Sequence, residues 1–225
     1  MHKECQLDLV DIKMIFFKQK IIFIHIPRCG GTFIEQNLWK KEFENEFKNC
    51  KNKKVLTISA RLSRTKGIEI FIDLINSILA FDNNIHGLIV GEAKSKNYLN
   101  KLHKKIKVFN LEKNISITGY RSDIYNILQY SYLTYCLSEV PEPFGRGVIE
   151  SIKLGTPVIA FNHGGAGEQL KEIFPEGMIN FRDFYGLQNK TKSFLKKRPQ
   201  IFKTTKFSLT KMKEKTLDVY LELVR

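Results

Sequence analysis

Cysteine is scarce in this 225-residue sequence, and the four that occur are widely spaced. They are Cys5, Cys29, Cys50 and Cys136. No C-x-x-C pair is present, which argues against a zinc-ribbon or dithiol redox centre. Neither G-x-G-x-x-G nor G-x-x-x-x-G-K-[ST] occurs after any predicted strand, so the usual dinucleotide and Walker phosphate loops are absent as well. We predict a reduced, cytoplasmic setting from the cysteine usage.

Long apolar runs are also missing. A membrane-spanning helix needs roughly 18 to 20 apolar residues, and the longest candidate, 14–26, is interrupted by Lys18, Gln19 and Lys20. The first residues include Glu4 and Asp8, where a secretory signal would be basic, and no small-residue cleavage site follows an apolar core. These features predict neither an integral membrane helix nor a secretory signal.

Positive charge is abundant. The 37 Lys and Arg residues outnumber the 23 Asp and Glu residues, giving a formal net charge of +14. This excess favours an anionic partner such as nucleotide phosphates or acidic lipid, although a general abundance of Lys, Asn and Ile would explain it equally well. Aromatic residues are not interleaved with the basic ones, so we expect no nucleic-acid partner. The basic stretch 190–206 is a candidate for peripheral contact with the inner membrane surface.

Short apolar runs alternate with longer amphipathic ones, and 43% of the residues are hydrophobic, enough for a packed core. The predicted strands are 21–26, 55–59, 87–90, 115–118, 132–135, 157–160 and 178–180. The predicted helices are 32–39, 68–80, 96–108, 124–130, 147–154, 168–173 and 209–224. This alternation predicts an α/β fold, a Rossmann-like parallel sheet flanked by helices. We assign 51–225 to that domain and 1–50 to an N-terminal strand-loop-helix extension; 182–206 is poorly patterned.

Two polar segments follow predicted strands. After 55–59 comes A-R-L-S-R-T-K-G, which places Arg61 and Lys66 at the carboxyl end of a strand, where a diphosphate could be neutralised. A basic loop of this kind is also common as a solvated surface.

The second segment, E-P-F-G-R-G-V-I-E at 142–150, leads from the strand 132–135 into a helix. Gly145 and Gly147 allow backbone N–H groups to approach an anion, and Arg146 adds charge there. Glu150 lies about one turn into the helix, where a carboxylate suits a ribose diol. Taken alone, Glu142 would equally serve as a helix cap and Glu150 as a solvated residue. A third segment, 162–168, follows strand 157–160 and opens another helix; its His163 is read as a loop residue.

Residues 55–173 resemble the C-terminal, donor-binding domain of GT-B retaining glycosyltransferases, the group of glycosyltransferase family four. That group has a strand followed by G-R-L-x-x-x-K-G, then E-x(7)-E, G-x-P-V-I-A and G-G-x-x-E. The corresponding segments here lie at 60–67, 142–150, 155–160 and 164–168. The resemblance implies the C-terminal half of a GT-B fold, and 207–224 resembles the helix that closes such domains.

The resemblance also implies roles for individual residues. Arg61 and Lys66 would hold the donor diphosphate and stabilise the leaving group, and Glu142 would face the donor sugar. Glu150 would bind the ribose. The backbone at Phe144, Gly145, Arg146 and Gly147 would contact sugar or phosphate. No cofactor or metal is implied, and no D-x-D motif is present; the donor would be a nucleotide-diphosphate sugar such as a UDP- or GDP-sugar.

A GT-B enzyme needs a second Rossmann-like domain that binds the acceptor, and 1–50 is too short to form one. We therefore expect transfer to a glycan or lipid-linked acceptor, in polysaccharide biosynthesis. Three interpretations stay open for the acceptor half: a separate partner chain that carries it, a truncated or degenerate gene product, and an unusual minimal transferase. The alternative function is a non-catalytic or degenerate nucleotide-sugar-binding module.

The N-terminal segment F-I-H-I-P-R-C-G-G-T at 23–32 resembles the 5′-phosphosulfate-binding loop of carbohydrate sulfotransferases. The backbone N–H groups of this glycine-rich turn, together with Arg28 and the Thr32 hydroxyl, could cradle a phosphate. A phosphoadenosine-phosphosulfate-binding fragment is therefore a further alternative, although we favour the interpretation that this loop is a remnant beside the sheet.

Overall fold

The computed structural model describes residues 13–16, 22–25, 31–202, 204 and 206–223. The chain divides into two compact units, Met1–Glu46 and Phe47–Arg225. The assignment of 1–50 and 51–225 to separate domains stays a prediction. No helix in the described ranges is long and apolar enough to cross a membrane.

The N-terminal unit contains an antiparallel strand pair and one helix. Strand β1 (Lys13–Phe16) pairs with β2 (Ile22–His25), with Met14 opposite Ile24. The predicted strand 21–26 is confirmed as β2, whereas β1 was not predicted. Helix α1 (Gly31–Glu46) is longer than the predicted 32–39, because its charged second half carries no apolar period to mark it. The Arg28–Gly30 part of the sulfotransferase-like loop lies outside the described residues.

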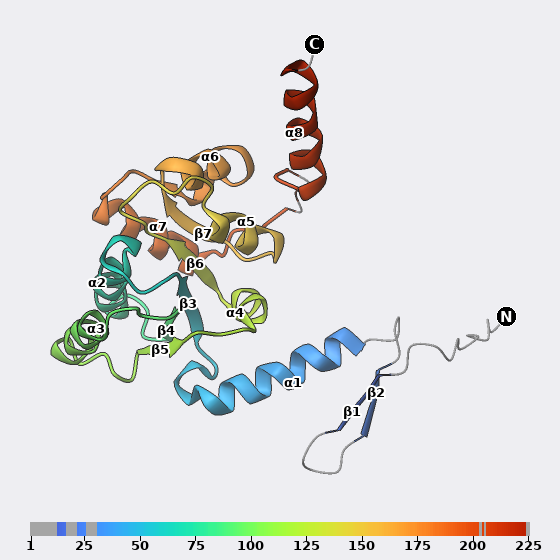
Figure 1. Cartoon of the computed structure of the whole chain (residues 1–225). Coiled ribbons are helices and arrows are strands. Elements are labelled where there is room, and N and C mark those ends of the chain that lie inside the picture. The colour runs from blue at the N-terminus through green and yellow to red at the C-terminus, as the bar shows by residue number, and fades with distance from the viewer. Residues whose placement is uncertain (1–12, 17–21, 26–30, 203, 205, 224–225) are drawn as a thin grey trace. The chain divides into compact units, whose positions relative to one another are not determined.

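The C-terminal unit is built on a six-stranded parallel sheet in the order β5-β4-β3-β6-β7-β8 (Figure 1). The strands are β3 (Lys54–Ser59), β4 (Ile85–Val90), β5 (Ile115–Gly119), β6 (Leu133–Cys136), β7 (Val158–Phe161) and β8 (Met178–Ile179). The predicted Rossmann-like α/β fold is confirmed. Every residue of β4 is buried, as expected for an interior parallel strand covered on both faces.

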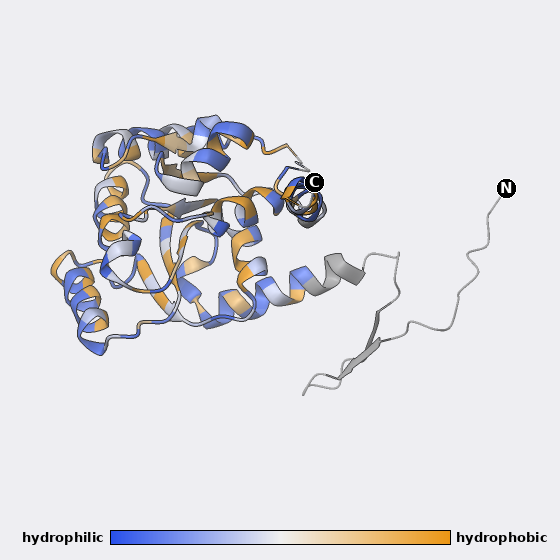
Figure 2. Ribbon diagram, turned by 45° about the horizontal axis from the view of Figure 1, so that its top comes forward, coloured by the Kyte–Doolittle hydropathy of each residue, from blue (hydrophilic) through white to orange (hydrophobic). Residues whose placement is uncertain are grey.

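Six helices pack in two groups, α2, α3 and α7 together and α4, α5 and α6 together. They are α2 (Ile68–Leu79), α3 (Lys96–Val108), α4 (Ile124–Tyr130), α5 (Arg146–Lys153), α6 (Gly164–Ile173) and α7 (Phe184–Lys196). Right-handed crossovers on either side of β3 and β6 place the two groups on opposite faces of the sheet. Hydrophobic and hydrophilic residues alternate along the helices, as Figure 2 shows.

Helix α7 corrects the interpretation of 182–206 as unpatterned. Asp183 caps it by accepting a hydrogen bond from the Gly186 amide, and Leu187, Phe194 and Leu195 are buried. The lysines between these positions and a polar residue on the buried face, Thr191, obscured the helical period. Helix α6 also begins earlier than predicted, at Gly164 rather than Glu168.

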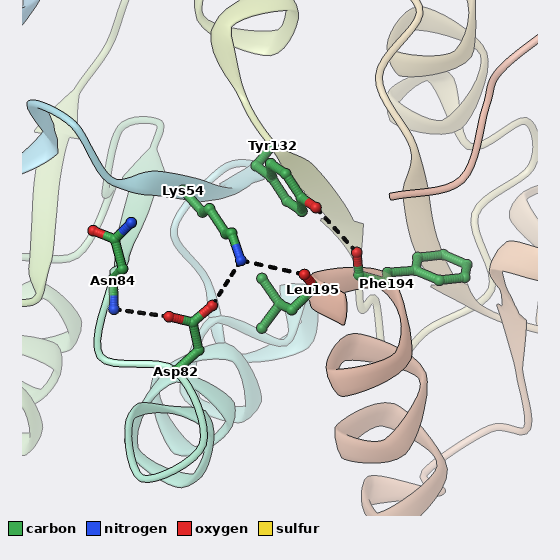
Figure 3. Close-up of polar contacts among 6 residues, drawn as sticks. All are labelled: Lys54, Asp82, Asn84, Tyr132, Phe194 and Leu195. Carbon is green, nitrogen blue, oxygen red and sulfur yellow. Dashed lines mark hydrogen bonds and ion pairs between the residues drawn. The ribbon is translucent and has the colours of Figure 1, made fainter. Parts of the chain in front are cut away.

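A polar cluster joins β3, the α2–β4 turn and the end of α7 (Figure 3). The Lys54 Nζ donates to Asp82 Oδ2 at 2.9 Å and to the Leu195 carbonyl at 3.2 Å. The Tyr132 hydroxyl donates to the Phe194 carbonyl at 3.3 Å. These bonds satisfy carbonyls in the last turn of α7 and fix it against the sheet.

Helix α8 (Leu209–Leu223) differs from the others, because its apolar side chains are exposed. Met212, Leu217 and Tyr220 are 58%, 57% and 64% exposed. The predicted helix 209–224 is therefore present, but within the described residues it buries none of the apolar positions that defined its period.

Candidate functional site

The strand order of the C-terminal unit reverses between β3 and β6, which are direct neighbours. In open α/β sheets, such a switch point leaves a crevice at the carboxyl ends of the strands. The loops that follow β3 and β6, 60–67 and 137–145, therefore flank one crevice. These are the loops that carry the predicted cations and carboxylates.

A pocket of about 490 Å³ occupies this crevice, and we call it the switch-point pocket. Six of the predicted site residues line it: Arg61, Lys66, Glu142, Arg146, Gly147 and Glu150. A smaller, more enclosed cavity of about 50 Å³ adjoins it and adds Gly145 and His163 to the lining. The fold thus brings together residues that are up to 89 positions apart in the sequence, Arg61 to Glu150.

Gly67 holds the first loop close to the second. Its φ of 70° lies in the left-handed region, and a Cβ built on it would lie 2.0 Å from the Leu137 carbonyl oxygen. Only glycine satisfies both conditions. The α2 end of the 60–67 loop is therefore fixed against the residue that follows β6.

Lys66 and Glu142 form an ion pair across the crevice. The Lys66 Nζ lies 2.6 Å from Glu142 Oε1, and the side chains are 29% and 35% exposed. A bound anion would compete with Glu142 for this lysine. The pair also fixes Glu142 at the mouth of the smaller cavity, which both residues line.

Arg146 and Glu150 form a second pair along α5. The Arg146 Nε and Nη2 both donate to Glu150 Oε1, at 3.1 and 2.8 Å. Glu150 Oε2 accepts no hydrogen bond from a described residue, so this oxygen can accept one from a ligand hydroxyl. Arg146 is largely exposed, at 77% of its side chain.

Arg61 and Phe144 differ from the paired residues. The exposed Arg61 side chain makes no hydrogen bond or ion pair with any described residue. The Phe144 carbonyl accepts a hydrogen bond from Gln169 Nε2, and its ring lies 6.1 Å from that of Phe207. Phe144 thus faces α8 rather than the switch-point pocket.

Cys136 and His163 also line the site, although neither was among the predicted site residues. Burial, followed by the negative charges of Glu142 and Glu150, raises the pKa of the Cys136 thiol to about 12, so it stays protonated and is a poor nucleophile. His163 stacks on Phe181 with ring centroids 4.4 Å apart, and its buried Nε2 has no hydrogen-bond partner in the described part of the chain. Position at a strand's carboxyl end was the signal that could have identified Cys136. Among the described residues, no group of three His, Cys, Asp or Glu side chains is placed to hold a metal ion.

The family comparison decides the class of protein. The model for glycosyl transferases group 1 matches residues 40–200, more than half of the chain. The chain belongs to this family. The match includes the switch-point pocket and all the helices that surround it.

Individual similar proteins agree with this family assignment. Mannosylfructose-phosphate synthase from Agrobacterium fabrum is 32% identical over 120 residues, which are 50% of this chain and 26% of that protein. The chain therefore spans about a quarter of the length of this curated relative. Anabaena Alr3699/HepE, solved in complex with UDP and glucose, is 26% identical with a TM-score of 0.63, over 69% of this chain and 42% of that one.

A glycosyltransferase from Rickettsia africae shares the fold, with a TM-score of 0.70 at 24% identity, over 82% of this chain and 52% of that one. The predicted GT-B likeness is thereby confirmed for the C-terminal unit. No comparison bears on the sulfotransferase-like segment.

Proposed function

We propose that the switch-point pocket binds a nucleotide-diphosphate sugar and that the chain supplies the donor half of a retaining, metal-independent glycosyl transfer. The observation that carries the proposal is the meeting of Arg61, Lys66, Glu142 and Glu150 in one pocket at the sheet's switch point. Membership of the group 1 family and the UDP complex of Anabaena Alr3699/HepE support it.

Arg61 and Lys66 are the residues we assign to the diphosphate. When the bond between the sugar and the phosphate breaks, negative charge grows on the leaving diphosphate. Two cations at this position stabilise that charge, as a metal ion can, and this supports the metal-independent assignment. Lys66 exchanges its contact with Glu142 for the diphosphate and leaves Glu142 free to face the donor sugar.

We assign the α5 end of the pocket to the nucleoside. Glu150 Oε2 is available to accept from a ribose hydroxyl, and Arg146 holds the other oxygen of the same carboxylate. The N-terminus of α5 presents backbone N–H groups from Gly147 and its neighbours to a phosphate. A Cβ at Gly147 would lie 2.8 Å from Cys136 Sγ, so glycine at this position lets α5 begin close to the end of β6.

The acceptor in this proposal is a glycan or lipid-linked sugar in polysaccharide biosynthesis, held by a separate acceptor-binding domain on a partner chain. The region matched here accounts for 42% of Anabaena Alr3699/HepE, so that relative contains further chain beyond the matched region. Peripheral contact with the inner membrane surface through the basic stretch 190–206 is part of the same proposal.

Calorimetric titration of the full chain with UDP, GDP, ADP, their sugar conjugates and phosphoadenosine phosphate tests the proposal. We expect micromolar binding of one diphosphate, weakened at least about tenfold by Lys66→Met, because a charge-assisted contact is lost. Lys171→Met, which removes an exposed lysine on α6 outside the pocket, is the matched control and should bind as the parent does.

Failure of the folded parent to bind any nucleotide would overturn the donor assignment and favour a degenerate module. Preferential binding of phosphoadenosine phosphate would instead favour the sulfotransferase-like reading of the N-terminal loop.

A further inference from the structure

A second cavity of about 630 Å³ lies beside the switch-point pocket and shares Arg61 and Lys66 with it. Its walls are the 61–66 segment after β3 and the segment 94–101, which joins the β4–α3 loop to the first turns of α3. Five cations line it, with no aspartate or glutamate among its lining residues. They are Arg61, Arg64, Lys66, Lys94 and Lys101. We call it the basic cavity.

Three carboxylates near the basic cavity are already paired with cations. On α2, Glu69 Oε2 lies 2.7 Å from the Lys101 Nζ, and Asp73 Oδ2 lies 2.7 Å from the Lys105 Nζ. Behind the 61–66 segment, Glu139 faces Arg182 at 3.6 Å. Arg64 and Lys94 make no ion pair with a described residue, so their charge is not compensated within the unit.

Tyr98 adds a buried polar group to this lining. The residue is 6% exposed, and its hydroxyl has no hydrogen-bond partner within ordinary distance and angle limits among the described residues. Burial, followed by the charge of Glu69 and the side-chain contact with it, raises the pKa of this hydroxyl to about 12, so the hydroxyl stays protonated. The amino end of α3 lies at the same wall, with its partial positive charge directed toward the cavity.

We propose that the basic cavity binds a phosphate group of the acceptor, so that the transferase acts on a phosphate-bearing acceptor held next to its donor. This inference rests on the proposed function, because it places the acceptor relative to a donor in the switch-point pocket. Unpaired guanidinium and ammonium groups and a helix amino end all select an anion that accepts hydrogen bonds. The shared residues Arg61 and Lys66 place that anion beside the donor diphosphate.

A fluorescein-labelled oligomer of three glycerol phosphodiester units is the probe, and fluorescence anisotropy with the full chain in 50 mM salt is the measurement. We expect saturable binding that persists when UDP is present at saturation. A neutral glucose trisaccharide with the same label should not bind. Displacement of the oligomer by UDP would place it in the switch-point pocket and overturn the proposal, as would tighter binding of an RNA trinucleotide.

The double variant Arg64→Gln, Lys94→Gln should weaken binding of the oligomer by about tenfold, because two charge-assisted contacts are removed. The control is Lys104→Gln, Lys107→Gln, which removes the same charge from exposed positions of α3 outside the cavity. Its effect should be below about twofold, since diffuse attraction between exposed charges is weak and screened. Equal weakening by both pairs would show general charge attraction and overturn the site.

The same preparations separate the two proposals. UDP should bind both double variants as it binds the parent, since neither pair lies in the switch-point pocket. A chain that binds the oligomer but no nucleotide would keep the phosphate site and refute the donor assignment. A chain that binds UDP but not the oligomer would keep the donor assignment and refute the phosphate site.

Discussion

The switch-point pocket and the basic cavity lie side by side at the same edge of the sheet, yet their charges are balanced differently. In the pocket, Lys66 pairs with Glu142 and Arg146 pairs with Glu150. In the cavity, Arg64 and Lys94 form no ion pair with a described residue, and the nearby Glu69, Asp73 and Glu139 are paired with other cations. The first site is close to neutral before a ligand arrives, whereas the second is strongly positive.

This difference in charge balance sets different requirements for a ligand at each site. A ligand of the pocket must displace Glu142 from Lys66, so it needs an anion and hydroxyl groups placed to use the carboxylates that remain. A ligand of the cavity needs only negative charge at the right place. In the proposed function, the pocket would select one donor, and the cavity would attract any acceptor with a phosphate in reach.

Gly67→Ala would disturb both sites at once and should have the largest effect. Alanine would have to adopt a left-handed backbone conformation at this position. Its Cβ would also lie 2.0 Å from the Leu137 carbonyl oxygen. We expect a fall of about 4 kcal/mol in the free energy of unfolding, measured by urea denaturation.

Gly119→Ala is the matched control for Gly67→Ala. It has a similar φ of 73° but no atom within 4 Å of the added Cβ. It should lower the free energy of unfolding only by the cost of the left-handed backbone conformation, about 1 kcal/mol. Equal losses in the two variants would contradict the close approach of the two loops.

His86 lies on β4, the strand that leads into the 94–101 wall of the basic cavity. It is fully buried on β4, and burial, with the positive charge of Lys53 second, lowers its pKa from 6.5 to about 4. Between pH 4 and pH 6.5, His86 binds a proton more readily in the unfolded chain than in the folded chain. The His86 contribution to stability is therefore complete above pH 6.5 and is lost as the pH falls toward 4.

The loss amounts to about 3 kcal/mol, by the conversion of a pKa shift into free energy. It is measured as the difference between parent and His86→Gln in urea midpoints from pH 7 to 4. The amide nitrogen of glutamine can still reach Ser116, which lies 2.9 Å from His86 Nε2 in the parent. The same pH slope in both proteins would refute the assignment to His86.

Glu142→Gln would make the pocket resemble the cavity and should have the smallest effect of the three. Lys66 loses its charged partner, so the diphosphate no longer competes with a carboxylate. We expect UDP to bind about fivefold more tightly in calorimetry, because one competing hydrogen bond contributes about 1 kcal/mol net. Weaker binding of UDP would show that Glu142 contributes to holding the nucleotide itself.

Much of the fold was predictable, because strands and helices in a parallel α/β unit have distinct apolar periods. The predicted helices 96–108 and 124–130 coincide with α3 and α4, and all six strands of the sheet lie within two residues of their predicted ends. Helix α7 was missed since its buried face includes Thr191, and its lysines suggested an unpatterned surface. The pattern of α8 predicted its helix but not that its apolar residues would be exposed.

The gathering of four predicted residues in one pocket was predictable, but their contacts were not. Strand ends and motif spacing brought Arg61, Lys66, Glu142 and Glu150 to one crevice. The pairing of Lys66 with Glu142 depends on three-dimensional geometry between residues 76 positions apart, which no local pattern encodes. The basic cavity was missed for the same reason, because Lys94 and Lys101 follow a different strand from Arg64.

The hydrogen-bonded ladder between β3 and β4 continues past the ends of both strands. The Ala60 amide donates to the Val90 carbonyl at 3.0 Å, and the Leu62 amide donates to the Glu92 carbonyl at 2.9 Å. A further bridge pairs Leu62 with Ala93, immediately before Lys94. The backbone that carries Arg61 and Lys94 is thus preorganised: its conformational entropy is lost when the sheet folds, and an arriving anion has to immobilise only the ends of side chains.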